Sequence, residues 1–197
     1  MHVVALVSSA GGLTATREVL GGLPADFPGC VLVLQHTSPD RDSSLAPILQ
    51  RSTELSVTAA EEGGPLAAGH VLVAPPGCHT LITPDGHTSL IISGRYPPAR
   101  PSADLLLATL AMAVGPLAIA VVMSGTGHDA ATGATAIHRR GGVVLTTDEE
   151  TSAHFSMPAA AIERDEIVDA VVPVPELPPR LLQLVTAPVL GGPADIA

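Results

Sequence analysis

The chain has 197 residues, of which 46% are hydrophobic and 14% are charged. A chain of this length suits one domain with a sizeable core, and its apolar content and low charge density exclude disorder for most of it. The formal net charge is −10, and all 9 basic residues are arginines. Because a phosphate-binding surface needs clustered cations, we expect neither nucleic-acid binding nor docking on an anionic membrane.

The cysteine content and the N-terminus indicate a cellular compartment. Cys30 and Cys78 are too few for a disulfide framework, and both stand in apolar stretches that are typical of small buried side chains. The N-terminal run at 1–7 lacks a basic flank and a cleavage site, so it does not have the pattern of a signal peptide. No apolar run approaches the roughly 20 residues that span a bilayer. We therefore expect a protein of the reducing cytoplasm without membrane insertion.

Short apolar runs alternate with helical patterns in the first fifty residues. The runs at 3–7 and 31–34 predict strands that are buried on both faces, and the patterns at 13–20 and 44–50 predict helices. The order strand, helix, strand, helix favours a parallel sheet with right-handed crossovers.

The middle of the chain has a different pattern. Short β-like runs at 71–74, 80–83 and 89–93 are separated by Pro75-Pro76-Gly77 and Pro84-Asp85-Gly86. Proline presets φ and glycine accepts positive φ, so both tripeptides are turn signals. We interpret the three runs as a short antiparallel excursion at one edge of the sheet.

The remainder of the chain returns to the alternating pattern. It predicts strands at 118–123, 143–146 and 168–172, and helices at 103–114, from 130 to about 138, at 159–164 and at 175–185. The fold class is therefore α/β, a doubly wound, mostly parallel sheet with helices on both faces. We expect one domain over residues 1–186 and a C-terminal tail over residues 187–197.

Three polar residues lie past the C-terminal ends of predicted buried strands, each before a helix. Ser9 follows the first strand, His36 the second, and Asp129 lies in the loop after the strand at 118–123. In an open α/β sheet, the carboxyl ends of the strands form the edge where ligands and chemistry collect. A hydroxyl, an imidazole and a carboxylate that meet there form a hydrolytic triad: the imidazole accepts the hydroxyl proton and the carboxylate orients the imidazole.

The residues alone leave other interpretations open. Ser-Ala-Gly-Gly at 9–12 is compatible with a phosphate-binding turn at a helix N-terminus, although the chain has no lysine of the kind a P-loop uses. His36 is compatible with a polar loop residue, and Asp129 with a helix N-cap. Ser8 also competes with Ser9 for the position that faces the site.

Five sequence blocks between residues 4 and 184 resemble, in order and spacing, the catalytic domain of the chemotaxis protein-glutamate methylesterases (CheB). The blocks are Leu6-Val7-Ser8-Ser9-Ala10-Gly11-Gly12, Gln35-His36, Arg100-Pro101-Ser102-Ala103-Asp104, Ser124-Gly125-Thr126-Gly127-His128-Asp129 and Met157-Pro158. The fold of that family is a doubly wound α/β sheet, which agrees with the pattern described above.

The resemblance implies a role for each residue of the constellation. Ser9 is the nucleophile, His36 the general base, and Asp129 the carboxylate that orients it. The implied substrate is a glutamate γ-methyl ester on a methyl-accepting chemoreceptor, hydrolysed to glutamate and methanol, with deamidation of receptor glutamine as a related activity. Backbone N–H groups near Thr126, and at the helix start beside Ala10 and Gly11, are the expected donors to the oxyanion.

The chain departs from the family pattern at several points. Ala10 stands where the family has threonine, and His128 stands where it has asparagine. These departures motivate an alternative, a catalytically weakened CheB-like interaction module in chemosensory signalling. Family members commonly carry an N-terminal receiver domain, whereas the first strand here begins at residue 3, so we expect any control by aspartyl phosphorylation to come from a separate response regulator or to be absent. The other histidines lack the spacing of a ligand set, so we expect no metal and no cofactor.

Overall fold

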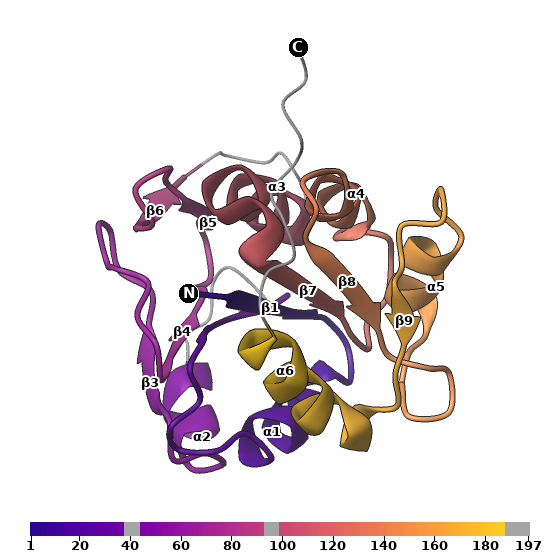
Figure 1. Ribbon diagram of the computed structural model, residues 1–197, viewed down its shortest axis with the longest axis horizontal. Helices are drawn as coiled ribbons and strands as arrows, with labels where there is room; N and C mark the ends of the chain where they lie inside the picture. The colour runs from indigo at the N-terminus through magenta and orange to yellow at the C-terminus, as the bar shows by residue number, and fades with distance from the viewer. Residues whose placement is uncertain (38–43, 93–98, 188–197) are drawn as a thin grey trace.

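The computed structural model describes residues 1–37, 44–92 and 99–187 (Figure 1). Seven parallel strands form one sheet in the order β3-β4-β2-β1-β7-β8-β9. The strands of this sheet are β1 (Val3–Ser8), β2 (Cys30–Gln35), β3 (Ser56–Ala59), β4 (His70–Val73), β7 (Ala118–Val122), β8 (Val143–Thr146) and β9 (Ala170–Val171). The helices are α1 (Gly12–Gly21), α2 (Leu45–Gln50), α3 (Ala103–Val114), α4 (Ala131–Arg139), α5 (Ser156–Ile162) and α6 (Leu177–Thr186), with short 3-10 turns η1 (Gly115–Leu117) and η2 (Val174–Glu176).

Strand β1 lies at the centre of the sheet, as its composition predicts. Each of its residues is buried, and it pairs in parallel with β2 on one side and with β7 on the other. A strand that is covered on both faces needs apolar side chains in both directions, which explains the uninterrupted run of valine, alanine and leucine.

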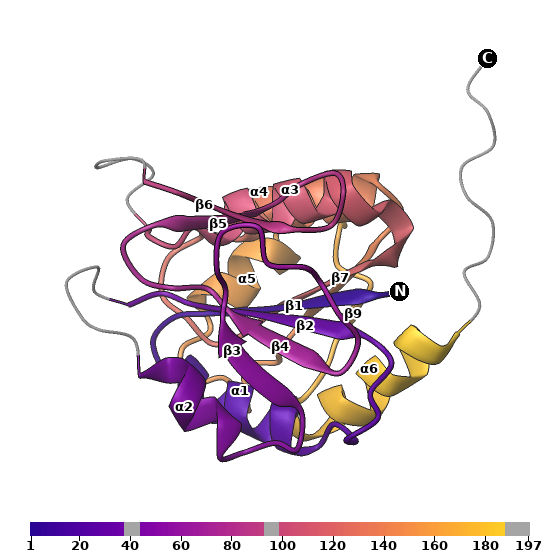
Figure 2. The same cartoon turned by 90° about the vertical axis from the view of Figure 1, so that its left-hand side faces the viewer.

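The helices cover both faces of the sheet. Helices α1, α2 and α6 pack on one face, and α3, α4 and α5 pack on the other, with the sheet between the two layers (Figure 2). The predicted doubly wound architecture is therefore confirmed. None of the helices within the described segments is long and apolar enough to cross a membrane.

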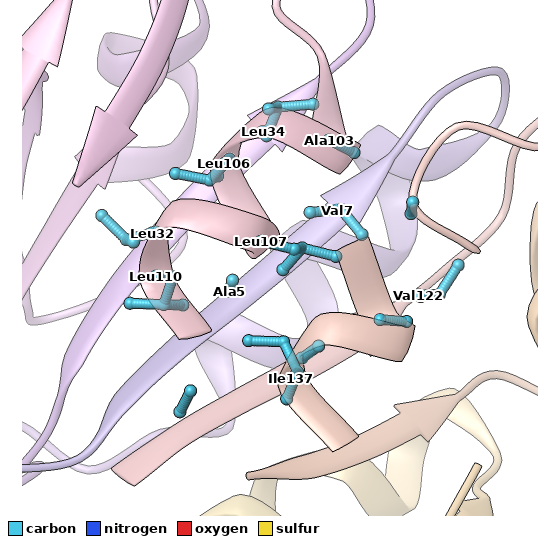
Figure 3. Close-up of a cluster of buried hydrophobic side chains, with 14 of the residues drawn as sticks. Ala5, Val7, Leu32, Leu34, Ala103, Leu106, Leu107, Leu110, Val122 and Ile137 are labelled. Carbon is cyan, nitrogen blue, oxygen red and sulfur yellow. The ribbon is translucent and has the colours of Figure 1, made fainter. Parts of the chain in front are cut away.

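Helix α3 is fixed on the sheet by leucines that follow helical spacing. Leu106, Leu107 and Leu110 are at most 1% exposed and point toward β1 and β2 (Figure 3). Burying a leucine side chain of this kind contributes about 2 kcal/mol to stability. Ala103, the first residue of α3, lies at the same end of this cluster as Val7. The packing therefore places the N-terminus of α3 beside the carboxyl edge of the sheet.

The middle of the chain is partly as predicted. Strands β5 (His79–Ile82) and β6 (Thr88–Ile91) form a separate two-stranded antiparallel sheet. The predicted antiparallel pairing of the run at 71–74 is wrong, because β4 pairs in parallel with both β2 and β3. The turn signals after this run mark a change of direction, but they carry no information about which strands become neighbours.

One helix start differs from the prediction, the strand predicted at 168–172 is shorter (Ala170–Val171), and one strand was not predicted. Helix α5 begins at Ser156, three residues before the predicted start, because Pro158 is accepted in the first turn of a helix, where its missing N–H is not needed. Strand β3 was not predicted, since only one of its four residues is buried. Residue 93 of the third β-like run and residues 188–197 of the predicted tail lie outside the described residues.

Candidate active site

The candidate site lies where the connections of two neighbouring strands diverge. Strand β1 leads to α1 on one face of the sheet, and its neighbour β7 leads to α4 on the opposite face. Such a divergence opens a crevice at the carboxyl ends of the two strands. Ser9 directly follows β1, and Asp129 lies in the loop between β7 and α4. The topology therefore brings both residues to this crevice.

Ser9 and His36 come from adjacent strands at the same level. Ser8 pairs with Gln35, and the His36 backbone N–H donates to the Ser8 carbonyl oxygen at 3.0 Å. Ser8 itself is fully buried and faces α1, since a Cβ placed on Gly12 would lie 2.4 Å from its Oγ. Ser9 is the next residue, and it lies beside the loop after β7, since a Cβ placed on Gly125 would lie 2.9 Å from the Ser9 Cβ.

His36 and Asp129 are in direct contact. The distance between His36 Nε2 and Asp129 Oδ2 is 2.8 Å, and the two side chains are 16% and 18% exposed. A carboxylate can only accept a hydrogen bond, so in the neutral ring Nε2 carries the hydrogen. The lone pair of the other ring nitrogen, Nδ1, is then available to accept a proton.

The Asp129 carboxylate is bound at the N-terminus of α3. Its oxygens accept the backbone N–H of Ala103 at 2.7 Å and of Asp104 at 3.0 Å, and the Ser102 hydroxyl at 3.1 Å. Burial alone raises the pKa of Asp129, but the hydrogen bonds from His36 and from the Asp104 and Ala103 N–H groups bring that pKa below its usual value. Asp129 is therefore an anion, and the dipole of α3 stabilises its charge.

A second carboxylate lies close to the first. The Asp104 side chain accepts the backbone N–H of Ala130 at 3.1 Å and of Gly133 at 2.7 Å, at the start of α4. Burial raises the pKa of Asp104, and the negative charge of Asp129 raises it further, against the lowering effect of these N–H groups. The two acidic side chains thus hold the beginnings of two neighbouring helices.

A buried histidine supports the same helix start from behind. The Ser102 backbone N–H donates to His79 Nδ1 at 3.1 Å, and His79 is 0% exposed. Burial and the charge of Arg100 lower the pKa of His79, although the charge of Asp129 acts in the opposite direction. The Ser102 hydroxyl also accepts the Leu105 N–H at 3.4 Å, so Ser102 is the N-cap of the helix predicted at 103–114.

Backbone hydrogen bonds hold the turn that carries Ser9. The Ser9 N–H donates to the Ser124 carbonyl oxygen at 2.9 Å. The Ser124 hydroxyl donates to the Ala10 carbonyl oxygen at 2.9 Å and accepts the His154 N–H at 3.0 Å. The Gly125 N–H donates to the His154 carbonyl oxygen at 2.9 Å. Ser124 thus ties together the turn after β1, the loop after β7 and the segment before α5.

Two glycines allow these segments to approach one another. Gly11 has φ of 75°, and a Cβ there would lie 2.6 Å from the Ala153 Cβ. A Cβ on Gly125 would lie 2.9 Å from the Ser9 Cβ and 2.2 Å from the Met157 sulfur. Any larger residue at either position would displace the turn or the loop.

The sequence-predicted oxyanion donors flank Ser9. Ala10 and Thr126 are exposed, and within the described segments neither backbone N–H has a protein acceptor. Gly11 occupies the N-cap position of α1. His128, next to Asp129, is also exposed. Within the same segments, no three His, Cys, Asp or Glu side chains are grouped as metal ligands.

The structure adds residues that the sequence did not single out for the site. They are Ser102, Asp104, His79 and Ser124. Each makes hydrogen bonds that hold another segment of the site in place. Ser102 and Asp104 are visible in the sequence as a helix-start pattern. Nothing in the sequence indicates which distant groups they bind.

Comparison with known proteins identifies the relatives of the chain. The family model described as CheB methylesterase matches residues 4–181. A protein-glutamate methylesterase/protein-glutamine glutaminase of Myxococcus xanthus is 36% identical over 179 residues, which are 91% of this chain and 50% of that protein. A protein of the same name from Pyrococcus abyssi is 35% identical over 92% of this chain and 50% of its own length. The chain thus spans about half the length of the curated relatives it matches.

A solved structure has a similar fold. The crystal structure of the Thermotoga maritima CheB methylesterase catalytic domain superposes with a TM-score of 0.89 at 33% sequence identity. The match covers 93% of this chain and 98% of that chain. The similarity therefore extends over the full catalytic domain of the relative.

Proposed function

The chain belongs to the CheB methylesterase family, and we propose that it is a serine hydrolase that demethylates glutamate γ-methyl esters on chemoreceptor-like proteins. The observation that carries this proposal is the 2.8 Å contact between His36 Nε2 and Asp129 Oδ2, at the strand ends beside Ser9. Ser9, His36 and Asp129 are the proposed catalytic residues, because this arrangement supplies a nucleophile, a base and an orienting anion.

In the first half of the proposed reaction, the Ser9 oxygen attacks the ester carbonyl carbon. His36 Nδ1 accepts the hydroxyl proton, because Nε2 already donates to Asp129. The anionic carboxylate stabilises the imidazolium that forms. His36 then gives its proton to the departing methoxide, which leaves as methanol, and an acyl-enzyme on Ser9 is the product.

In the second half, water attacks the acyl-enzyme with His36 again as base, and glutamate and free Ser9 result. Each attack places negative charge on the carbonyl oxygen. The backbone N–H groups of Ala10, Gly11 and Thr126 are the proposed donors to this oxyanion. A well-placed donor of this kind lowers the barrier by about 3 kcal/mol.

The same chemistry extends to a second substrate. Replacing methoxide by ammonia as the leaving group turns ester hydrolysis into deamidation of a receptor glutamine. The two curated relatives compared above are named for both activities. We therefore include glutamine deamidation in the proposal, to be measured as ammonia release.

The proposal also includes a substrate protein, a source of regulation, a cellular location and the domain bounds. The substrate partner is a methyl-accepting chemoreceptor-like protein, and a separate response regulator is the predicted source of control. The predicted location is the cytoplasm. The predicted domain is residues 1–186, with residues 187–197 as a tail.

The decisive experiment measures methanol release from a methylated chemoreceptor. Ser9→Ala removes the nucleophile, and we expect the rate constant to fall by about 10⁴-fold or more. Ser8→Ala is the matched control: its hydroxyl is buried toward α1 and, among the described residues, has no hydrogen-bond partner. We expect that variant to retain the wild-type rate.

Two outcomes would contradict the proposal. Equal rates in wild type and Ser9→Ala would exclude Ser9 as the nucleophile. No methanol from wild type would instead support the interaction module that Ala10 and His128 suggest. With His36 as the base, the rate must also rise with pH as the imidazole loses its proton.

A further inference from the structure

We propose that Asp104 is a positioning residue for the reaction: it fixes the loop that carries Asp129, and its charge supports the His36 imidazolium. This inference rests on the proposed function, which does not include Asp104. The observation behind it is a reciprocal arrangement of two carboxylates. Each stands at the start of one helix and binds the start of the other.

The reciprocity is seen in the hydrogen bonds. Asp129 precedes α4, yet its oxygens accept N–H groups of α3, from Ala103 and Asp104. Asp104 lies in the first turn of α3, yet its Oδ1 accepts N–H groups at the start of α4, from Ala130 and Gly133. Neither helix start can shift without breaking bonds to the other, so the orientation of Asp129 depends on Asp104.

Close packing of the two helices makes this exchange possible. A Cβ on Gly133 would lie 2.6 Å from the Leu107 Cβ and 2.9 Å from the Asp104 carbonyl oxygen. Only glycine lets α4 approach α3 so closely. The approach places the Gly133 N–H 2.7 Å from the Asp104 Oδ1. The cross-link is therefore built into the contact between the helices.

The charge of Asp104 has a role beyond that of a hydrogen-bond acceptor. An asparagine oxygen would accept the same N–H groups without bringing a second negative charge close to Asp129. Burial and the charge of Asp129 both raise the pKa of Asp104, and the N–H groups of Gly133 and Ala130 lower it. In the proposed reaction, that negative charge favours the protonated ring of His36, which must exist after the Ser9 proton is transferred.

The charged surroundings of this imidazole come from several elements. Asp129 contacts it from the loop after β7, and Asp104 lies behind that carboxylate on α3. The buried His79 on β5 is under the influence of both Arg100 and Asp129. Replacing Asp104 by asparagine keeps the size of the side chain and removes its negative charge, while His36 and Asp129 stay unaltered.

The test compares Asp104→Asn, Asp104→Ala and a control, Asp169→Asn. Asp169 is an exposed residue just before β9, and its carboxylate accepts the Val144 N–H of β8 at 2.7 Å. This bond has the same length and chemistry as the Gly133 N–H bond to Asp104. The two readouts are kcat and KM for methanol release, and the midpoint of the NMR titration of the His36 ring, assigned with His36→Gln.

The alanine variant tests position, and the asparagine variant tests charge. We expect Asp104→Ala to lower kcat by about 10- to 100-fold with KM unchanged, because a small misplacement of a catalytic group has effects of this size. We expect Asp104→Asn to lower kcat by about three- to tenfold, less than Asp104→Ala because the hydrogen bonds remain, and to move the His36 titration and the acid limb of the rate profile to lower pH. Asp169→Asn should change neither readout.

The NMR readout separates this inference from the proposed function. If His36 titrates at the same pH in Asp104→Asn as in wild type, or if folded Asp104→Ala has the wild-type kcat, the inference is wrong. If wild type releases no methanol but its His36 titration moves in Asp104→Asn, the proposed function fails and the coupling of Asp104 to His36 stands.

Discussion

The two halves of the site differ in how much of their geometry the protein itself determines. In the base half, the Asp129 carboxylate accepts hydrogen bonds from two side chains, the His36 ring and the Ser102 hydroxyl, and from two backbone N–H groups. In the nucleophile half, the Ser9 hydroxyl has no hydrogen-bond partner within the described segments, and Ala10 and Thr126 beside it are exposed.

This difference indicates that, in the proposed reaction, the protein alone positions the base, whereas the substrate completes the surroundings of the nucleophile. The base half is preorganised, which lowers the cost of forming the imidazolium in the transition state. The nucleophile half has a fixed backbone but leaves its hydroxyl and N–H groups open. The carbonyl oxygen of a bound ester would be the acceptor for these N–H groups, so the substrate completes this part of the second half.

The largest expected effect comes from neutralising the centre of the base half. Asp129→Asn keeps the size of the side chain but presents an amide NH₂ or an uncharged oxygen to His36, which disturbs the ring tautomer. We expect kcat to fall by about 10⁴-fold. Methanol release from a methylated receptor measures it, and a loss smaller than tenfold would mean that the preorganised carboxylate is not needed.

A second prediction tests the packing of α3 on the sheet, because the N-terminus of α3 binds the Asp129 carboxylate. Leu107→Ala removes a leucine that is 0% exposed and lies between α3 and the sheet. We expect a loss of about 3 kcal/mol in the free energy of unfolding, measured by urea denaturation. Met112→Ala on the same helix is the control, because Met112 is 64% exposed and its loss should change stability by less than about 0.5 kcal/mol. Equal effects would contradict the packing of α3.

A third prediction concerns pH. Burial and the charge of Arg100 lower the pKa of His79 below its ordinary value of 6.5, so the folded protein favours the neutral ring. Its contribution to stability is complete above pH 6.5 and is lost as the pH falls from there toward the lower pKa of the folded state. Urea denaturation at several pH values should show a smaller acid-dependent loss in His79→Gln than in wild type. Parallel curves would show that His79 is not held neutral.

The smallest expected effect is at the loop that carries Asp129. Ala130 has φ of 104°, a conformation that favours glycine. In Ala130→Gly, relief of backbone strain of about 1–2 kcal/mol is offset by the lost methyl group and the greater entropy of the unfolded chain. We expect a change below about 0.5 kcal/mol by thermal or urea denaturation. Ala134→Gly, within α4, should cost about 1–2 kcal/mol, and equal costs would argue against strain at Ala130.

The placement of the three polar residues could be predicted from the sequence because it follows from strand ends. Ser9 and His36 directly follow buried apolar runs, and parallel neighbours end at the same edge of a sheet. The sequence also predicts the cap at Ser102. In both cases the signal is local, since it is carried by residues next to one another in the chain.

The partners of Asp129 could not be predicted in this way. As an isolated residue it suggested an N-cap for the helix that follows it, but α4 has Ala130 at its N-cap without a side-chain hydrogen bond. The oxygens of Asp129 bind the start of α3 instead. Asp104 lies 25 residues away in the chain, and no local pattern links the two. Strand β3 is missing from the prediction for the opposite reason, since its exposed edge position needs no apolar run.

Asp129 binds both the His36 ring and the N-terminus of α3, and this constrains how the domain can evolve. Because its carboxylate also closes the start of α3, a descendant that lost the proposed activity would still need this residue for folding. Ser9 carries no comparable structural duty through its hydroxyl, so mutation can remove it at little cost to the fold. Inactive members of such a lineage should therefore retain the aspartate and lose the serine, and the aspartate by itself is a poor marker of an active enzyme.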